Sequence, residues 1–186
     1  SITKARAGRE LVDFGLLREK GAVAFSDDGS SVEDKEIMSE ALQKAARAKG
    51  LIIAHCEDKT LSGSGVVNLG LFSTKLGLRG ISNESEYKRI ERDISLAHKA
   101  GAVIHIAHVS TRQSVEVISE AKSKKIKVTA EATPHHLVLA EEAVCSYDTN
   151  MKMNPPLRSK DDVLAIKKAL KRSEERRVGK ECTIQC

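Results

Sequence analysis

Four short apolar segments alternate with segments of helical periodicity along this chain. The apolar segments cover residues 22–29, 51–58, 101–111 and 126–133, and each ends in polar side chains. Apolar runs of this length, bounded by helical patterns, are typical of strands buried on both faces of a parallel sheet. We therefore predict four parallel strands joined by right-handed helical crossovers, in an α/β fold.

Helical periodicity marks five segments before, between and after these strands. They are residues 9–20, 31–50, 84–100, 112–124 and 159–170. Apolar side chains recur three and four residues apart in each of them, as on a helix with one buried face. In the first helix this pattern places Leu16 among the inward side chains, and Gly21 closes the helix. Ser159 is the expected N-cap of the last helix.

The segment between residues 59 and 83 shows no sustained period. It contains five glycines and directly follows the polar end of the second predicted strand. A long connection in this position is typically functional. We predict an irregular, mobile loop at the rim of the sheet.

Side-chain alternation divides the third predicted strand into two faces. His108 falls on the same face as Ile104 and Ile106, whereas His105 falls on the other. We expect His108 to serve function and His105 to pack towards the helices. The same alternation places Asp28 with the small side chains of the first strand.

Polar residues follow the strands at positions that a parallel sheet brings to one edge. They are Asp28, His55, His108, His135 and His136. Each alone has an ordinary explanation, such as a turn, a packed histidine or a helix cap. Together, a carboxylate and imidazoles at the ends of different strands are the ligand set of a zinc ion or a similar divalent metal. The pattern thus favours a metal site at this edge.

Composition excludes several classes of protein. The 186 residues can bury one core, as one domain or as part of a larger one. The net charge of +5 is spread along the helices, which argues against nucleic-acid binding. No apolar segment is long enough to cross a membrane, and residues 1–4 do not begin a signal peptide. We expect a cytoplasmic protein whose four irregularly spaced cysteines are reduced.

Five strings of residues at the strand ends and before the last helix carry a family resemblance. They are residues 24–29 (AFSDDG), 55–58 (HCED), 105–111 (HIAHVST), 128–137 (VTAEATPHHL) and 152–158 (KMNPPLR). In order and spacing they closely resemble the bacterial type of dihydroorotase, within the amidohydrolase superfamily. The resemblance covers nearly all of residues 2–170.

The resemblance implies a (β/α)₈ TIM barrel that holds two zinc ions. Such enzymes interconvert N-carbamoyl-L-aspartate and L-dihydroorotate in pyrimidine biosynthesis. By the same resemblance, Asp28 matches the carboxylate that bridges the metals, and His55 and His108 match the ligands of the second metal. Asn154 matches an asparagine that contacts the substrate, although no periodicity places it.

Several groups of the family have no match in this sequence. The resemblance places the His-x-His pair of the first barrel strand before residue 1, and the proton-transferring Asp beyond residue 170. Residues 1–171 then correspond to a partial barrel, roughly strands four to seven with their helices. We therefore assign no catalytic residue within the chain and expect the chain alone to be inactive.

The last residues depart from the family pattern. Residues 172–186 look like the translation of a sequencing adapter, and we leave them out of the fold prediction. Two of the four cysteines, Cys182 and Cys186, lie in this tail, so their spacing is not interpreted as a metal site.

Two other functions stay open at this point. Allantoinases and hydantoinases share the barrel but usually carry a carboxylated lysine at the position of Asp28, which favours dihydroorotase. A non-catalytic homologue that binds aspartate transcarbamoylase is the structural alternative. For dihydroorotase, and for an allantoinase or hydantoinase, the expected partner is a small-molecule substrate. A homodimer, or association with aspartate transcarbamoylase, is the expected assembly.

Overall fold

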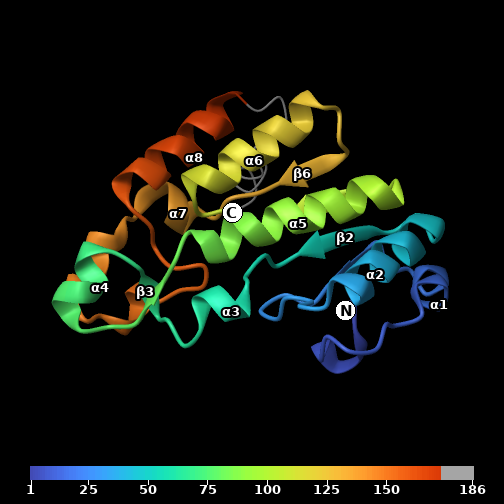
Figure 1. Ribbon diagram of the computed structural model, residues 1–186, viewed down its shortest axis with the longest axis horizontal. Coiled ribbons are helices and arrows are strands. Elements are labelled where there is room, and N and C mark those ends of the chain that lie inside the picture. The colour runs from blue at the N-terminus through green and yellow to red at the C-terminus, as the bar shows by residue number, and fades with distance from the viewer. Residues whose placement is uncertain (173–186) are drawn as a thin grey trace, which may run out of the picture.

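The four predicted strands form one parallel sheet. The computed structural model (Figure 1) describes residues 1–172. In this part of the chain the strand order is β1-β2-β5-β6. Their bounds are Ala24–Ser26, Leu51–Ala54, Ile104–Ile106 and Val128–Ala130. Each strand is shorter than its apolar segment: the polar end of every segment lies outside the ladder, and β1, β5 and β6 also begin two or three residues into their segments. The sequence therefore located all four strands and their parallel direction.

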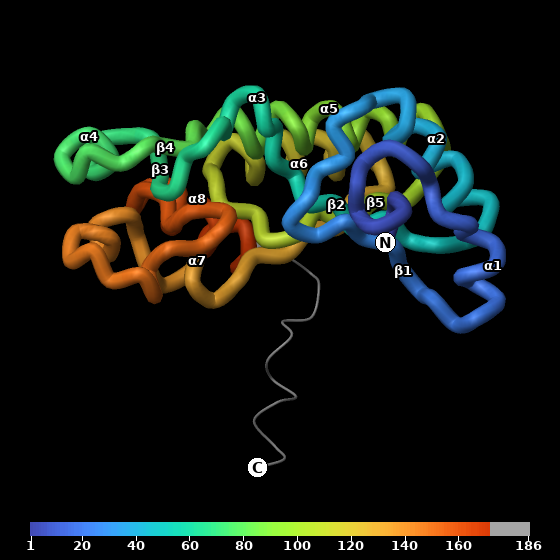
Figure 2. The backbone as a smooth tube through the Cα atoms, turned by 90° about the horizontal axis from the view of Figure 1, so that it is seen from below, coloured from blue at the N-terminus to red at the C-terminus, as the bar shows by residue number. Residues whose placement is uncertain are grey.

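Three amphipathic helices cover one face of this sheet. They are α2 (Lys35–Arg47), α5 (Glu84–Ala100) and α6 (Arg112–Ser123). Their apolar stripes meet Phe25, Ile52, Ile104 and Val128 of the strands in a single buried core. Figure 2 shows these helices gathered on the same side of the strands. The four helices predicted from residue 31 onwards are confirmed, but α2 begins at Lys35, after its N-cap Asp34, and not at residue 31.

The other face of the sheet has no layer of helices in the described part of the chain. Ser26, Ile53, His105 and Thr129 lie in register across the four strands. These side chains are only half-buried, whereas Ile52 and Ile104 on the opposite face are fully buried. The prediction of strands buried on both faces is therefore wrong for this part of the protein, because one helical layer covers one face only.

The face predicted for His105 is wrong, and His108 lies beyond the end of β5. Ile104 and Ile106 face the helices, so His105 lies on the uncovered face, where its Nδ1 is 2.8 Å from Thr129 Oγ1. His108 shares neither face. The strand ends at Ile106, and a positive φ of 37° at His108 turns the chain there. Alternation with period two holds only inside a strand, so it could not place a residue beyond the end.

The first helix is shorter than predicted. Helix α1 covers Phe14–Glu19 and begins at Asp13, whose side chain accepts a hydrogen bond from the Leu16 amide. Phe14 is buried against Phe25, with ring centroids 4.6 Å apart, whereas Leu16 is 51% exposed. The expected inward position of Leu16 is wrong because the helix starts later and presents a different face.

Residues 59–83 are folded rather than irregular. They form α3 (Lys59–Ser62), β3 (Val67–Asn68), α4 (Leu71–Leu76) and β4 (Gly80–Ile81), and β3 pairs with β4 in parallel. A Cβ at Gly65 would lie 2.4 Å from the Ile81 side chain, so this glycine permits close packing. The prediction of an irregular loop is wrong because elements this short carry no periodic signal.

The C-terminal part of the described chain packs beside α6. It contains α7 (Pro134–Val138), two 3₁₀ helices (Glu141–Ser146 and Thr149–Met151) and α8 (Lys160–Arg172). Ser159 Oγ accepts the Asp162 amide at 3.2 Å, as expected for the N-cap of α8. No helix of the described residues is long and apolar enough to cross a membrane. Residues 173–186, the bulk of the predicted artefact, lie outside the described residues.

Candidate metal centre

Three side chains meet at the carboxyl ends of adjacent strands. Asp28 lies two residues after β1, His55 follows β2 directly, and His108 lies two residues after β5. Because these strands are neighbours and parallel, their ends lie at one edge of the sheet. Among the described residues, these three form the group of potential metal ligands that the fold brings together.

The three potential ligand atoms form a compact triangle. His55 Nδ1 lies 3.0 Å from His108 Nε2 and 3.5 Å from Asp28 Oδ1, and His108 Nε2 lies 3.3 Å from Asp28 Oδ1. Ligand atoms bound tetrahedrally at about 2.0 Å from zinc are roughly 3.3 Å apart. The same distances permit hydrogen bonds between the groups in the metal-free protein. The residues thus fit one divalent ion without rearrangement of the strands.

Burial and charge make this triangle asymmetric. The side chain of His55 is 2% exposed and that of His108 15%, whereas that of Asp28 is 71% exposed. Partial burial acts to raise the pKa of Asp28, but the hydrogen bond from His108 and the nearby imidazoles outweigh it. The pKa therefore lies below its ordinary value, and Asp28 is ionised at neutral pH. The site opens to solvent on the side of this carboxylate.

A buried carboxylate from α5 fixes the loop that follows His108. Glu86 accepts hydrogen bonds from the amides of Ser110 and Thr111, both at 3.0 Å, and from Ser114 Oγ at 2.6 Å. The Ser110 hydroxyl donates to it as well. Glu86 is 3% exposed, so water cannot take its place as the hydrogen-bond acceptor of these amides and hydroxyls. The position of His108 therefore depends on a side chain of the outer helical layer.

Arg158 joins this loop to the segment between β2 and α5. It is 2% exposed, and its guanidinium donates to Ser110 Oγ at 3.0 Å. It also donates to Asn68 Oδ1 and the Ile81 carbonyl, both at 2.9 Å. One arginine thus holds the β3–β4 pair, the His108 loop and the segment that carries Asn154.

Glu57 lies on the side of His55 that faces away from Asp28. Its Oε2 is 3.2 Å from His55 Nε2, 2.7 Å from Lys59 Nζ and 3.1 Å from Asn154 Nδ2. The hydrogen bond with His55 holds the pKa of Glu57 well below its ordinary value, and Lys59 and Asn154 act in the same direction. Glu57 therefore links Asn154 to His55 of the metal triangle, and Asn154 itself is not one of the three ligands.

His135 and His136 lie outside the triangle, although they follow a strand of the same sheet. Both belong to α7, where the Thr133 side chain is the N-cap. His135 is exposed, and His136 is buried with its Nε2 3.1 Å from the Pro155 carbonyl. The structure thus places His136 in the packing around α7, and it brings three of the five polar positions together.

The buried state of His136 predicts a pH dependence of stability. Burial lowers the pKa of His136 below the ordinary 6.5, so the unfolded chain binds its proton more readily than the folded chain. The free energy of unfolding is then lost as the pH falls below about 6.5. Urea unfolding between about pH 5 and 8 measures this loss, which should be smaller in His136→Gln. An equal loss in the variant would contradict the prediction.

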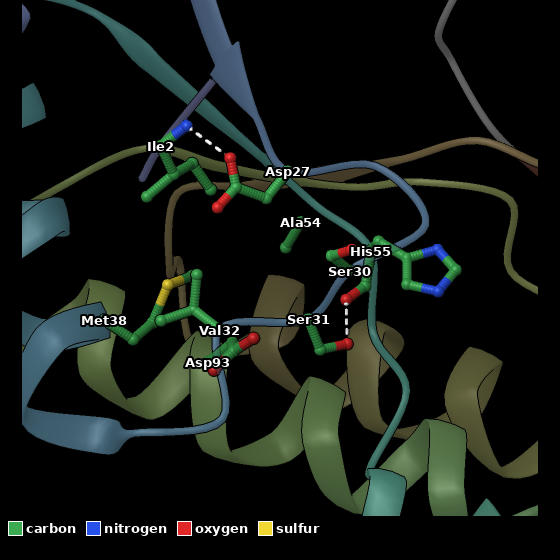
Figure 3. A pocket seen from close by; sticks show the side chains of 9 residues that line it. All are labelled: Ile2, Asp27, Ser30, Ser31, Val32, Met38, Ala54, His55 and Asp93. Atoms are coloured by element: carbon green, nitrogen blue, oxygen red, sulfur yellow. Dashed lines mark hydrogen bonds between the residues drawn. The ribbon is translucent and has the colours of Figure 1, made fainter. Parts of the chain in front are cut away.

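A small cavity lies beside His55 but is not the metal site. Figure 3 shows it between Ile2, Asp27, Met38 and Asp93, with the imidazole of His55 pointing away. Its volume of about 10 Å³ is room for at most one water molecule. Any larger ligand of the triangle therefore lies on the exposed side, next to Asp28.

Sequence reasoning missed Glu57, Glu86 and Arg158. Glu57 could have been found, because it stands two residues after His55 within a quoted motif. Glu86 could not, because on a helix it has the pattern of a solvated carboxylate and its partners come from another segment.

Comparisons with known proteins find the same family as the five sequence motifs. A family model described as "Dihydro-orotase-like" matches residues 1–114. A dihydroorotase from Elusimicrobium minutum is 54% identical over 171 residues, which is 92% of this chain and 40% of that protein. A dihydroorotase from Listeria monocytogenes is 50% identical over 170 residues, or 91% of this chain and 40% of that protein. The chain thus spans about two fifths of the length of these relatives.

Solved structures show the same fold at lower identity. A D-hydantoinase structure is 24% identical with a TM-score of 0.68, covering 85% of this chain and 36% of that one. The dihydropyrimidinase from Brevibacillus agri gives the same identity and TM-score, covering 84% and 36%. These likenesses establish the fold class, a partial TIM barrel.

Proposed function

Since the chain belongs to the dihydro-orotase-like family, we propose that the protein containing these residues is a metal-dependent cyclic amide hydrolase. Its reaction is the interconversion of N-carbamoyl-L-aspartate and L-dihydroorotate. The relatives at about 50% identity that bear the name dihydroorotase support this choice. The structures of hydantoinases support the fold alone.

The observation that carries the proposal is the triangle of Asp28, His55 and His108. Its oxygen and two nitrogens, all within 4.8 Å of one another, suit zinc or a similar divalent ion. We propose Asp28 as the carboxylate shared between two zinc ions and the histidines as ligands of the second. Zinc supplies two kinds of chemistry, activation of water for attack and polarisation of the amide carbonyl.

The residues of this chain then contribute binding and orientation. Asp28 brings negative charge to the exposed side of the site, and His55 and His108 present one nitrogen each. Asn154 is proposed to contact the substrate from its place beside Glu57. The proton-transferring carboxylate and the first metal's histidines have no counterpart among these groups, so the 186-residue chain alone should not turn over substrate.

We further propose a cytoplasmic location and a small-molecule substrate. A homodimer, or association with aspartate transcarbamoylase, is part of the proposal for the whole protein. These assignments follow from the family resemblance.

A chimaeric enzyme tests the proposal. Residues 1–170 replace the matching segment of the Elusimicrobium minutum dihydroorotase, which is 54% identical to this chain. We expect zinc-dependent ring opening of dihydroorotate within about tenfold of the parent enzyme, because the chain supplies the same ligands in the same order. Absorbance of the ring measures turnover.

The controls separate the three functions. His108→Ala in the chimaera should abolish turnover, because a ligand is lost. Faster turnover of hydantoin or dihydrouracil than of dihydroorotate would favour the hydantoinase alternative. A folded chimaera that binds zinc but converts none of these substrates would contradict the proposal and favour a non-catalytic scaffold.

A further inference from the structure

We propose that Glu57 is a positioning residue that prepares His55 for metal binding and orients Asn154 at the same time. The inference rests on the proposed metal site and adds a residue to it. One carboxylate oxygen, Oε2, contacts both side chains. The metal side and the substrate side of the site therefore share a single acceptor.

The geometry selects one tautomer of His55. An ionised carboxylate can only accept hydrogen bonds, so the proton must lie on His55 Nε2, 3.2 Å from Glu57 Oε2. In the neutral ring Nδ1 then has a free lone pair. That nitrogen is the one directed towards His108, at 3.0 Å, and Asp28, at 3.5 Å. Carboxylates hydrogen-bonded to a ligating histidine set its tautomer and orientation in this way.

The position of Glu57 is itself fixed by its surroundings. Its side chain is 9% exposed, and Lys59 Nζ donates to the same oxygen at 2.7 Å. Its backbone amide donates to Ser31 Oγ at 2.9 Å, and the Ser31 hydroxyl donates to the His55 carbonyl at 2.6 Å. The carboxylate is thus a rigid reference for the imidazole, not a mobile surface group.

The contact with Asn154 determines the direction of that amide. Asn154 Nδ2 donates to Glu57 Oε2 at 3.1 Å, so Oδ1 is the atom left to accept a hydrogen bond from a ligand. Loss of Glu57 removes the constraint on His55 and on Asn154 together. Among the described residues, Glu57 is the side chain whose hydrogen bonds join His55 to Asn154.

Nitrogen NMR of the metal-free 186-residue chain tests the tautomer directly. Spectra of ¹⁵N-labelled histidine at about pH 8 should show His55 protonated on Nε2 with an unprotonated Nδ1. Glu57→Ala should produce a mixture of tautomers, and Glu57→Gln, which keeps one acceptor oxygen, should restore the Nε2–H form. Asp58→Asn is the matched control, since Asp58 accepts from Thr60 and contacts Arg89 but not His55.

Titration with Co²⁺, followed by its visible absorbance, measures the consequence for metal binding. We expect Glu57→Ala to weaken binding about 10- to 100-fold, the usual effect of removing a partner of a ligating histidine. Asp58→Asn should bind as the wild type does.

The outcomes separate this inference from the proposed function. His55 protonated on Nδ1 in the wild type, or an unchanged tautomer and Co²⁺ affinity in Glu57→Ala, overturns the role of Glu57. The wild-type spectrum decides the tautomer even where Glu57→Ala fails to fold. A wild-type chain with the Nε2–H tautomer but no affinity for Co²⁺ overturns the metal site of the proposed function instead.

Discussion

Replacing His108 by alanine is expected to remove divalent metal binding from this chain, and His55→Ala should have the same effect. Each substitution deletes one of three ligand atoms that lie 3.0 to 3.5 Å apart. Asp28 and one imidazole then remain, and such a pair competes poorly with water for a divalent ion. We expect a loss in affinity of more than about 100-fold, beyond the usual effect of removing a partner of a ligand. Titration of the purified chain with Co²⁺ or Zn²⁺ measures it.

Two other histidines serve as controls for this experiment. His105 lies on the uncovered face of the sheet with Thr129 as its partner, and His135 is exposed on α7. His105→Asn and His135→Ala should leave the stoichiometry and affinity of metal binding unchanged. Equal losses in these variants would show that binding is adventitious, and unchanged binding in His108→Ala would show that the triangle is not the site.

Replacing Glu86 by alanine is expected to cost about 3–5 kcal/mol of unfolding free energy, the range for breaking a buried charged network. The carboxylate satisfies two backbone amides and the Ser114 hydroxyl inside the protein. Arg158, with Nη2 3.8 Å from Glu86, would become a buried cation without its carboxylate. Urea unfolding of the wild type and the variant gives the difference.

The exposed Glu91 on the same helix is the matched control. It lies within α5 on the solvent side, so Glu91→Ala should change the unfolding free energy by less than about 0.5 kcal/mol. Glu86→Gln should fall between the two, because it keeps one acceptor but loses the charge facing Arg158. A loss in Glu86→Ala no greater than that in Glu91→Ala would contradict the role of the network.

The candidate site itself was largely accessible from the sequence. Asp28, His55 and His108 each lie at the polar end of an apolar segment, and parallel strands must end at one edge. The structure brings these three within bonding distance of one metal ion, while His136 turns into the packing of α7. Residues at the ends of neighbouring parallel strands are predicted to lie close to one another. The backbone angles of the next one or two residues decide where each side chain points.

The amino-acid sequence by itself determined the four strands, their parallel direction and the helices that cover the sheet, because periodic patterns and caps are local signals. It also carried the motifs that identify the family. Only the tertiary structure decided which face of β5 the helices cover, how His108 turns away after Ile106, and why residues 59–83 fold. The roles of Glu57, Glu86 and Arg158 were also decided by the tertiary structure alone. Their partners come from distant segments, and a hydrogen bond between distant segments exists only once packing has brought them together.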